Sequence, residues 1–319
     1  MGHVSRAFPH FFSLHFLSLP NIMTYMTREF EYIIDEQFHN QTILAFLKAH
    51  GYSHAVLVHL KKTPESILRN GIWEHVNAVL QTGDLLHISL IEKEGSSDIP
   101  PVCLPFSIVY EDEDLLIVNK PAHMPVHPSL NHYENTLANA VCHYYTNQGI
   151  AYTFRCVNRL DRDTTGLTIL AKHMLSSAIL SQAVTRREIN REYLAIVKGN
   201  VPDSGTIDAP IGRKEGSAME REVDFSHGER AVTHYQRLAY KNGYSLLSLK
   251  LETGRTHQIR VHMKYIGHPL IGDFLYNPDS KEISRQALHS YRLSFTHPIT
   301  GVPMTLTAPL PADMKQFFP

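Results

Sequence analysis

Residues 159–166 read RLDRDTTG, and this octapeptide joins two apolar stretches of the chain. Two apolar residues precede it, and the run LTILA (167–171) follows it. The aspartate, threonine and glycine residues at its end favour a turn, because each type tolerates or stabilises tight backbone geometry. The sequence therefore places Asp161 in a loop at the edge of packed structure, between Arg159 and Arg162.

A carboxylate flanked by arginines has two interpretations. It can belong to a structural ion pair beside a turn, or it can act on an electrophile, since neighbouring positive charge keeps it ionised. For an isolated Arg-x-Asp-Arg motif, the structural ion pair is the commoner case. The choice between the two therefore depends on the rest of the chain.

Further segments of the chain carry a resemblance to a known family. Together with the octapeptide, the sequence resembles the RNA pseudouridine synthases with an R-L-D motif, which include bacterial ribosomal and transfer RNA uridine isomerases. The resemblance covers about two thirds of the chain, from residue 106 onwards, and its longest segment is highly specific. The segments are EDEDLLIVNKPAHMPVHPS (111–129), REYLAIVKG (191–199), LETGRTHQIRVHMKYIGHPLIGD (251–273) and QALHSYRLSFTHP (286–298).

One position departs from the family pattern. The residue before R-L-D is often histidine in the family, whereas here it is Asn158. Asparagine still donates and accepts hydrogen bonds. The departure therefore does not argue against activity.

The resemblance implies a catalytic site of three residues. Asp161 is expected to be the catalytic carboxylate. Tyr193 would stack on the target base and take part in proton transfer, whereas a strand tyrosine without such a role is usually part of the core. Arg255 precedes a helix that the apolar spacing predicts over residues 256–267, and it would pair with Asp161.

Other residues are expected to contact RNA. By resemblance, Arg159 would enter the space left when the target uridine turns out of its stack. The first turn of the predicted helix offers side chains and free backbone N–H groups to phosphate and base edges, although an ordinary charged helix has the same pattern. The expected RNA contacts are Arg159, Arg162, Thr256, His257, Gln258, Arg260 and Lys120.

The expected reaction requires neither a cofactor nor a metal. Converting uridine to pseudouridine breaks the N1–C1′ bond, turns the uracil and rejoins it through C5, with no change in redox state. The chain contains no GxGxxG, Walker loop, HExxH or Cys/His ligand spacing, so none is indicated. Three routes remain open, because Asp161 can attack the sugar, attack the ring or remove a sugar proton.

Charge is unevenly distributed along the chain. The formal net charge is −1, although an RNA-binding protein needs positive charge. Near the octapeptide the balance is positive, which is what phosphate binding requires. Between residues 155 and 191 the bases are Arg155, Arg159, Arg162, Lys172, Arg186, Arg187 and Arg191, and the acids are Asp161, Asp163 and Glu188.

Composition indicates a cytoplasmic protein that does not enter membranes. The three cysteines show no CxxC spacing, which indicates reduced thiols. The apolar stretch FPHFFSLHFLSLP (8–20) is too short to span a bilayer. We expect residues 1–26 to be a loose extension and the protein to be a monomer.

Composition shifts divide the remaining chain. Residues 27–91 resemble an S4-type RNA-binding module, with two short helices followed by strands around an Asn-Gly turn; a small domain that only packs on its neighbour is the alternative. Residues 92–105 are expected to be a linker, and residues 106–319 the catalytic domain. Helices lie among sequential strands without regular alternation, which predicts an α+β fold with a mixed, mainly antiparallel sheet.

Two other function classes remain open. A non-catalytic RNA-binding or ribosome-assembly factor would keep the basic face, but it would not need Asp161, Tyr193 and Arg255 together. A glycoside or nucleoside hydrolase would need two carboxylates that flank a bond. Asp161 and Asp163 are two residues apart in one loop, which is a poor arrangement for that purpose. We expect an RNA uridine isomerase that acts on ribosomal rather than transfer RNA.

Overall fold

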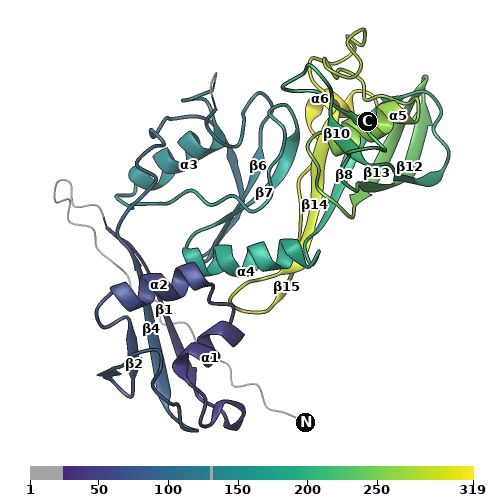
Figure 1. The fold of residues 1–319 in the computed structure, drawn as a ribbon. Coiled ribbons are helices and arrows are strands. Elements are labelled where there is room, and N and C mark those ends of the chain that lie inside the picture. The colour runs from purple at the N-terminus through teal and green to yellow at the C-terminus, as the bar shows by residue number, and fades with distance from the viewer. Residues whose placement is uncertain (1–23, 130–131) are drawn as a thin grey trace.

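The computed structural model describes residues 24–129 and 132–319 (Figure 1). The N-terminal module, residues 24–92, is a four-stranded antiparallel sheet in the order β1-β4-β2-β3, accompanied by two short helices. The predicted extension lies outside the described residues up to residue 23, whereas Met26 already begins the first strand. The elements of the module are β1 (Met26–Ile33), the 3-10 helix η1 (Glu36–Phe38), α1 (Ile43–Ala49), α2 (His54–Lys62), β2 (Ile67–Arg69), β3 (Ile72–Trp73) and β4 (Leu85–Glu92).

Local sequence signals explain where these helices and the hairpin begin. The hydroxyls of Thr42 and Ser53 each accept a hydrogen bond from the backbone N–H three residues later, which caps α1 and α2. Asn70 and Gly71 have φ angles of +53° and +79°, the left-handed geometry that a tight hairpin turn requires. The two predicted helices and the Asn-Gly turn are therefore confirmed.

The C-terminal domain is built on one nine-stranded sheet in the order β5-β6-β7-β14-β8-β13-β12-β9, with β15 paired to β14. All neighbouring strands are antiparallel except β7 and β14. The expected α+β fold with a mixed, mainly antiparallel sheet is confirmed. Within the described ranges, no helix is long and apolar enough to cross a membrane. The elements are β5 (Ser107–Glu111), β6 (Leu115–Lys120), α3 (Leu137–Thr146), β7 (Thr165–Ala171), α4 (Met174–Thr185), β8 (Asn190–Lys198), β9 (Ser204–Asp208), β10 (Ile211–Arg213), β11 (Arg221–Val223), β12 (Val232–Lys241), β13 (Tyr244–Leu251), α5 (Gln258–Tyr265), β14 (Leu288–Thr296), β15 (Pro303–Thr307) and α6 (Ala312–Lys315).

The segment predicted as a linker contains no helix or strand between β4 and β5, but it is packed against the C-terminal domain. Ser96 donates its backbone N–H to the carbonyl of Tyr152 at 3.1 Å. The Asn139 side chain of α3 donates to the carbonyl of Pro100 at 2.8 Å. Backbone groups along the segment are therefore bonded to the C-terminal domain.

The module joins the domain through α4 and through an ionic network at the β5–β6 turn. Helix α2 lies against α4 (Figure 1). Arg28 of β1 donates Nε to Asp114 Oδ1 at 2.8 Å, and His173 Nε2 lies 2.9 Å from the same oxygen. Burial alone raises the pKa of Asp114, but the bonds from His173 and Arg28 hold it at about 2. The negative charge of Asp114 at the junction is therefore balanced by the bonds from Arg28 and His173.

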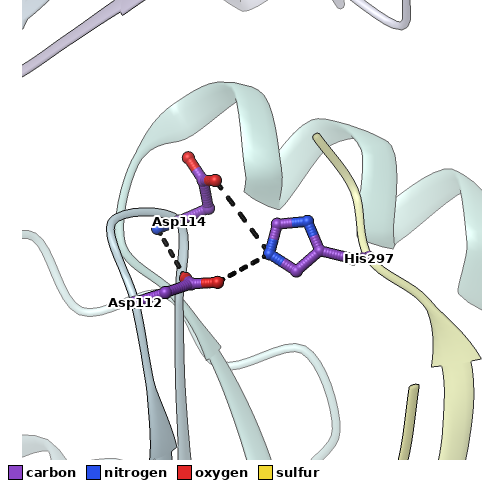
Figure 2. Close-up of side chains that lie close together, drawn as sticks. All are labelled: Asp112, Asp114 and His297. Carbon is purple, nitrogen blue, oxygen red and sulfur yellow. Dashed lines mark hydrogen bonds and ion pairs between the residues drawn. The ribbon is translucent and has the colours of Figure 1, made fainter. Parts of the chain in front are cut away.

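Asp112, Asp114 and His297 lie close enough together at this junction to suggest a metal site (Figure 2). Their ligand atoms are already engaged, however. Asp112 Oδ1 accepts two backbone N–H groups, and its Oδ2 accepts the Tyr110 hydroxyl at 2.6 Å and lies 2.9 Å from His297 Nε2. The cation that faces Asp114 is the guanidinium of Arg28. We therefore interpret the cluster as a structural joint between the two parts.

Two strands cross closely where the octapeptide ends. Strand β7 pairs in parallel with β14 only at Thr165–His289 and Gly166–Ser290. Gly166 has a φ of +112°, and a Cβ atom there would lie 2.3 Å from the carbonyl oxygen of Ser290. Since only glycine satisfies both conditions, Gly166 allows β14 to pass directly beside the loop that carries Asp161.

This crossing predicts the effect of Gly166→Ala. The substitution should lower the free energy of unfolding by more than about 3 kcal/mol, because the methyl group meets the backbone of β14 as well as an unfavourable φ. Gly243→Ala is the matched control, since Gly243 has a φ of +80° and nothing within 4 Å of its Cβ position; it should cost only about 1 kcal/mol. Urea unfolding followed by circular dichroism measures both. Equal losses would contradict the close crossing.

Candidate active site

Asp161 lies in the loop that leads into β7, and the residue that departs from the family pattern holds this loop in place. Asn158 is buried. Its Nδ2 donates to the carbonyl of Leu167 at 3.1 Å, and its Oδ1 accepts from the N–H of Ile169 at 2.8 Å. Asn158 therefore ties the start of the loop to the strand that follows it.

Lys120, at the end of β6, supports the same loop from inside the domain. It is completely buried, and its Nζ donates to the carbonyls of Pro121, Met124 and Arg162 at 2.8, 2.8 and 2.9 Å. Burial lowers the pKa of Lys120 to about 7, although the charges of Asp163 and Asp161 oppose this shift. The expected phosphate contact by Lys120 is corrected, because all three donors of the ammonium are directed at carbonyl groups and none reaches the surface.

Arg162 and Asp163 form a local pair in the loop. Arg162 donates Nη2 to Asp163 Oδ2 at 2.8 Å, and His123 Nδ1 lies 2.9 Å from Asp163 Oδ1. Burial raises the pKa of Asp163, but the bonds from Arg162 and His123 outweigh it and hold the pKa below its usual range. Asp163 is therefore a buried support, whereas Arg162 is partly exposed and engaged with it.

Arg260 of α5 lies between two carboxylates. Its Nη1 donates to Asp161 Oδ2 at 3.0 Å, while its Nε and Nη2 donate to both oxygens of Asp273 at 2.7 and 2.8 Å. Burial lowers the pKa of the guanidinium, but Asp273 and Asp161 raise it above its ordinary value. The ring of Tyr276 lies 5.0 Å from the same guanidinium. Arg260 is almost fully buried, so the expectation that it contacts phosphate is corrected.

Arg255 does not form the ion pair with Asp161 that the sequence predicted. Its guanidinium pairs with Glu229 and donates Nε to the carbonyl of Arg230 at 3.2 Å. Helix α5 begins at Gln258 rather than near residue 256. Arg255 precedes the helix, as expected, but its side chain pairs with Glu229 instead of Asp161. The charge partner of Asp161 is Arg260, which the helix directs into the domain.

The residues between Arg255 and Arg260 have different roles. Thr256 is exposed on the rim. His257 occupies the position before α5 with a φ of +58°, and its side chain makes no capping hydrogen bond. Its Nδ1 lies 2.9 Å from the hydroxyl of Tyr276 and its Nε2 lies 3.9 Å from Asp161 Oδ2. Burial lowers the pKa of His257. Gln258 is buried and hydrogen-bonded to four groups of the domain, so the RNA contact expected of it is corrected.

Asp161 borders both a small cavity and a large groove. The cavity has a volume of about 80 Å³ and is lined by Tyr193, His257 and Arg260 among others. The groove has a volume of about 1000 Å³ and extends from Asp161 to the C-terminal end of α4. Arg159 is exposed and lines both. The loop, β8 and α5 therefore bring an accessible carboxylate to the floor of an open groove.

Tyr193 reaches the cavity from β8. The alternation predicted for this strand is observed, because Tyr193 packs in one hydrophobic cluster with Ala195 and Val197, while Ile196 lies in another. Only 5% of Tyr193 is exposed, and burial raises the pKa of its hydroxyl. The phenol is therefore neutral at physiological pH, as a group that exchanges a proton with a substrate needs to be before it acts as an acid.

Sequence reasoning gave no role to Asp273 or Tyr276, which hold Arg260 and His257. Asp273 is the last residue of the matched segment 251–273, so the signal was present, but sequence separation hides the pairing. Arg191 also lines both the cavity and the groove. Arg191 is the first residue of the matched segment REYLAIVKG (191–199), two residues before Tyr193, so the sequence also contained a signal for it.

The different environments of Arg260 and Arg255 predict different mutational costs. Arg260→Ala should lower the free energy of unfolding by about 3–5 kcal/mol, because Asp273 is left as a buried, unpaired charge. Arg255→Ala should cost less than about 1 kcal/mol, since Arg255 and Glu229 form an exposed pair. Arg260→Lys should fall between them, because lysine keeps the charge but cannot pair bidentately. Urea unfolding measures all three, and equal losses for Arg260→Ala and Arg255→Ala would contradict this arrangement.

The chain is similar to proteins of one known family. A family model for RNA pseudouridylate synthases matches residues 114–265. YjbO of Bacillus subtilis, named as an uncharacterized RNA pseudouridine synthase, is 42% identical over 267 residues, which cover 83% of this chain and 94% of that protein. Ribosomal large subunit pseudouridine synthase D of Escherichia coli is 40% identical over 239 residues, which cover 70% of this chain and 73% of that protein.

A solved structure also resembles this fold. Human RNA pseudouridylate synthase domain containing 1 matches 66% of this chain and 85% of its own, with a TM-score of 0.56 and 26% identity. Since the chain shares 42% identity with a relative along nearly the whole length of that relative, it belongs to the R-L-D motif family of RNA pseudouridine synthases, which are isomerases.

Proposed function

We propose that the protein converts uridines of structured ribosomal RNA to pseudouridine, with Asp161 as the catalytic carboxylate. The observation that carries this proposal is the position of Asp161, which is 26% exposed on the floor of an open groove while its partner Arg260 is buried behind it. A structural ion pair does not require access to a groove, whereas a catalytic carboxylate does. Because Arg260 binds only one oxygen of Asp161, the other oxygen remains available to a substrate.

The reaction assigns a role to each group around the cavity. The N1–C1′ bond breaks, a C5–C1′ bond forms, the proton of C5 is lost and N1 gains a proton, so the product is an isomer of the substrate. Asp161 acts near C1′ or the ring, and Arg260 keeps it ionised and oriented. Tyr193 supplies a ring against which the detached uracil stacks and a hydroxyl that can exchange a proton. Attack on the sugar, attack on the ring and removal of a sugar proton all use the same carboxylate.

The target uridine must leave its stack to reach the cavity, because base-modifying enzymes act on a nucleotide that is turned out of its helix. The cavity and the groove share Asp161 in their linings. Arg159 is exposed and borders both spaces, which supports its proposed entry into the space that the uridine leaves. Arg255 and Thr256 are exposed and line the groove. We therefore propose that they contact RNA and do not act beside Asp161. His257 is placed to orient Asp161 and the incoming nucleotide.

The proposal of ribosomal RNA rests on relatives and on the N-terminal module. The relative from Escherichia coli is named for the large ribosomal subunit. We propose that the module is S4-like and binds RNA, with the exposed Lys61 and Lys62 at the end of α2 as contacts. Arg69 is less suited, because it pairs with Glu74 and Asp84. We further propose that the enzyme acts in the cytoplasm as a monomer.

The first test is the substitution Asp161→Asn. On RNA labelled with tritium at C5 of uridine, the wild type should release tritium to water, and Asp161→Asn should release it at least about 10³-fold more slowly, as expected for loss of a group at the reacting atoms. RNA affinity should be retained. A non-catalytic RNA-binding or assembly factor would release none in either form, and equal release by both forms would exclude Asp161 as the catalytic carboxylate.

Substitutions of Tyr193 separate its two proposed roles. Tyr193→Phe keeps the ring but removes the hydroxyl, so single-turnover release should fall by about 10²-fold or more if the hydroxyl transfers a proton. Tyr193→Leu removes both, so it should fall further. Wild-type rates for Tyr193→Phe would exclude the proton transfer, and equal rates for the two variants would exclude the stacking.

A further inference from the structure

The β10–β11 hairpin borders a second hollow beside the active-site groove. Its volume is about 380 Å³, within the range that small polar ligands occupy. The segment Gly254–Thr256 lines both spaces. A nucleic acid strand that passes Asp161 in the groove can therefore reach this hollow by crossing one short segment of backbone.

Two arginines lie directly opposite each other in this hairpin. Arg213 and Arg221 are register partners of the antiparallel pair, and both line the hollow. Like charges in directly opposed positions destabilise a strand pair. The neighbouring positions do not show this conflict, because Lys214 pairs with Glu220. The hairpin thus keeps one unfavourable pair, on the side that faces the hollow.

Nearby acids do not neutralise this pair. Among the residues that the structure describes, Arg213 forms no ion pair, and Arg221 donates Nη1 to the carbonyls of Met219 and Glu220. Glu222 follows Arg221 and alternates to the other face of its strand. Glu229, the acid of the hollow, is engaged with Arg255. The lining therefore holds three guanidinium groups and one carboxylate.

We propose that this hollow binds a phosphodiester group of the RNA backbone beside the target uridine, through Arg213 and Arg221. This inference rests on the proposed function, because it assigns the next contact of the same RNA. An anion between the two arginines removes their repulsion, and guanidinium groups donate bidentately to phosphate oxygens. Phosphate contacts set the register of a strand without reading its bases, so the hollow would position the uridine over Asp161.

The test measures the salt dependence of RNA binding. The probe is a fluorescein-labelled RNA stem-loop of about twenty nucleotides with uridines in its loop, titrated with the full chain between about 50 and 200 mM KCl. Each phosphate contact adds about 0.7–0.9 to the slope of log affinity against log salt. Arg213→Gln/Arg221→Gln removes one phosphate contact, so it should lower the magnitude of the slope by about 0.7–0.9 and weaken binding about tenfold at the lower salt concentration.

Lys214→Gln is the matched control, because it removes one positive charge from the same hairpin but lies outside the hollow. Its slope should equal that of the wild type. Arg213→Lys/Arg221→Lys should restore most of the slope, which separates loss of charge from loss of folding. An unchanged slope in the Gln double variant, or an equal change in Lys214→Gln, would overturn the proposal. An equal loss of binding to poly-L-glutamate would also overturn it, since the hollow would then be a general polyanion surface.

The result is independent of the reaction. If wild-type protein releases no tritium from labelled RNA but the Gln double variant still changes the slope, then the proposed isomerisation fails and the phosphate site stands. If tritium is released and the slope does not change, then the site fails and the isomerisation stands.

Discussion

The guanidinium of Arg260 joins two carboxylates that lie far apart in the sequence, and the rest of the site depends on this arrangement. Asp273 takes two of its donors and Asp161 takes a third, so the groups form a compact network with one exposed end. A buried arginine is tolerated only when its donors are satisfied. Because Asp273 provides the buried pair, the one oxygen of Asp161 that Arg260 does not engage can face the groove.

The same loop is supported from the other side by groups that have no access to substrate. Lys120 binds three carbonyls, Asn158 ties the loop to β7, and Gly166 lets β14 pass at backbone contact. These residues are buried, so their contribution is to hold Asp161 in one position. Small displacements of a reacting group reduce rates strongly, which explains why so many buried polar groups surround a single carboxylate.

Much of this arrangement follows from local patterns. The helices capped by Thr42 and Ser53, the Asn-Gly turn, the alternation in β8 and the loop position of Asp161 all depend on interactions within a few residues, so the sequence predicts them. The partner of Asp161 could not be predicted in this way. Arg255 and Arg260 both belong to one motif, and only the tertiary contacts show that Arg260 reaches Asp161 while Arg255 pairs with Glu229.

The sequence by itself determined the class of fold, the family of the protein and the residues from which the site is built. Periodicity, turn chemistry and motifs each depend on residues that are close together in the chain. Only the tertiary structure decided which of the predicted RNA contacts are exposed. Lys120, Gln258 and Arg260 are polar residues in matched motifs, yet they are buried, whereas Arg159 and Thr256 are open to the groove. Burial depends on which strands and helices meet in space, and that depends on contacts between residues far apart in the sequence, such as Asp161 and Arg260, which are 99 positions apart.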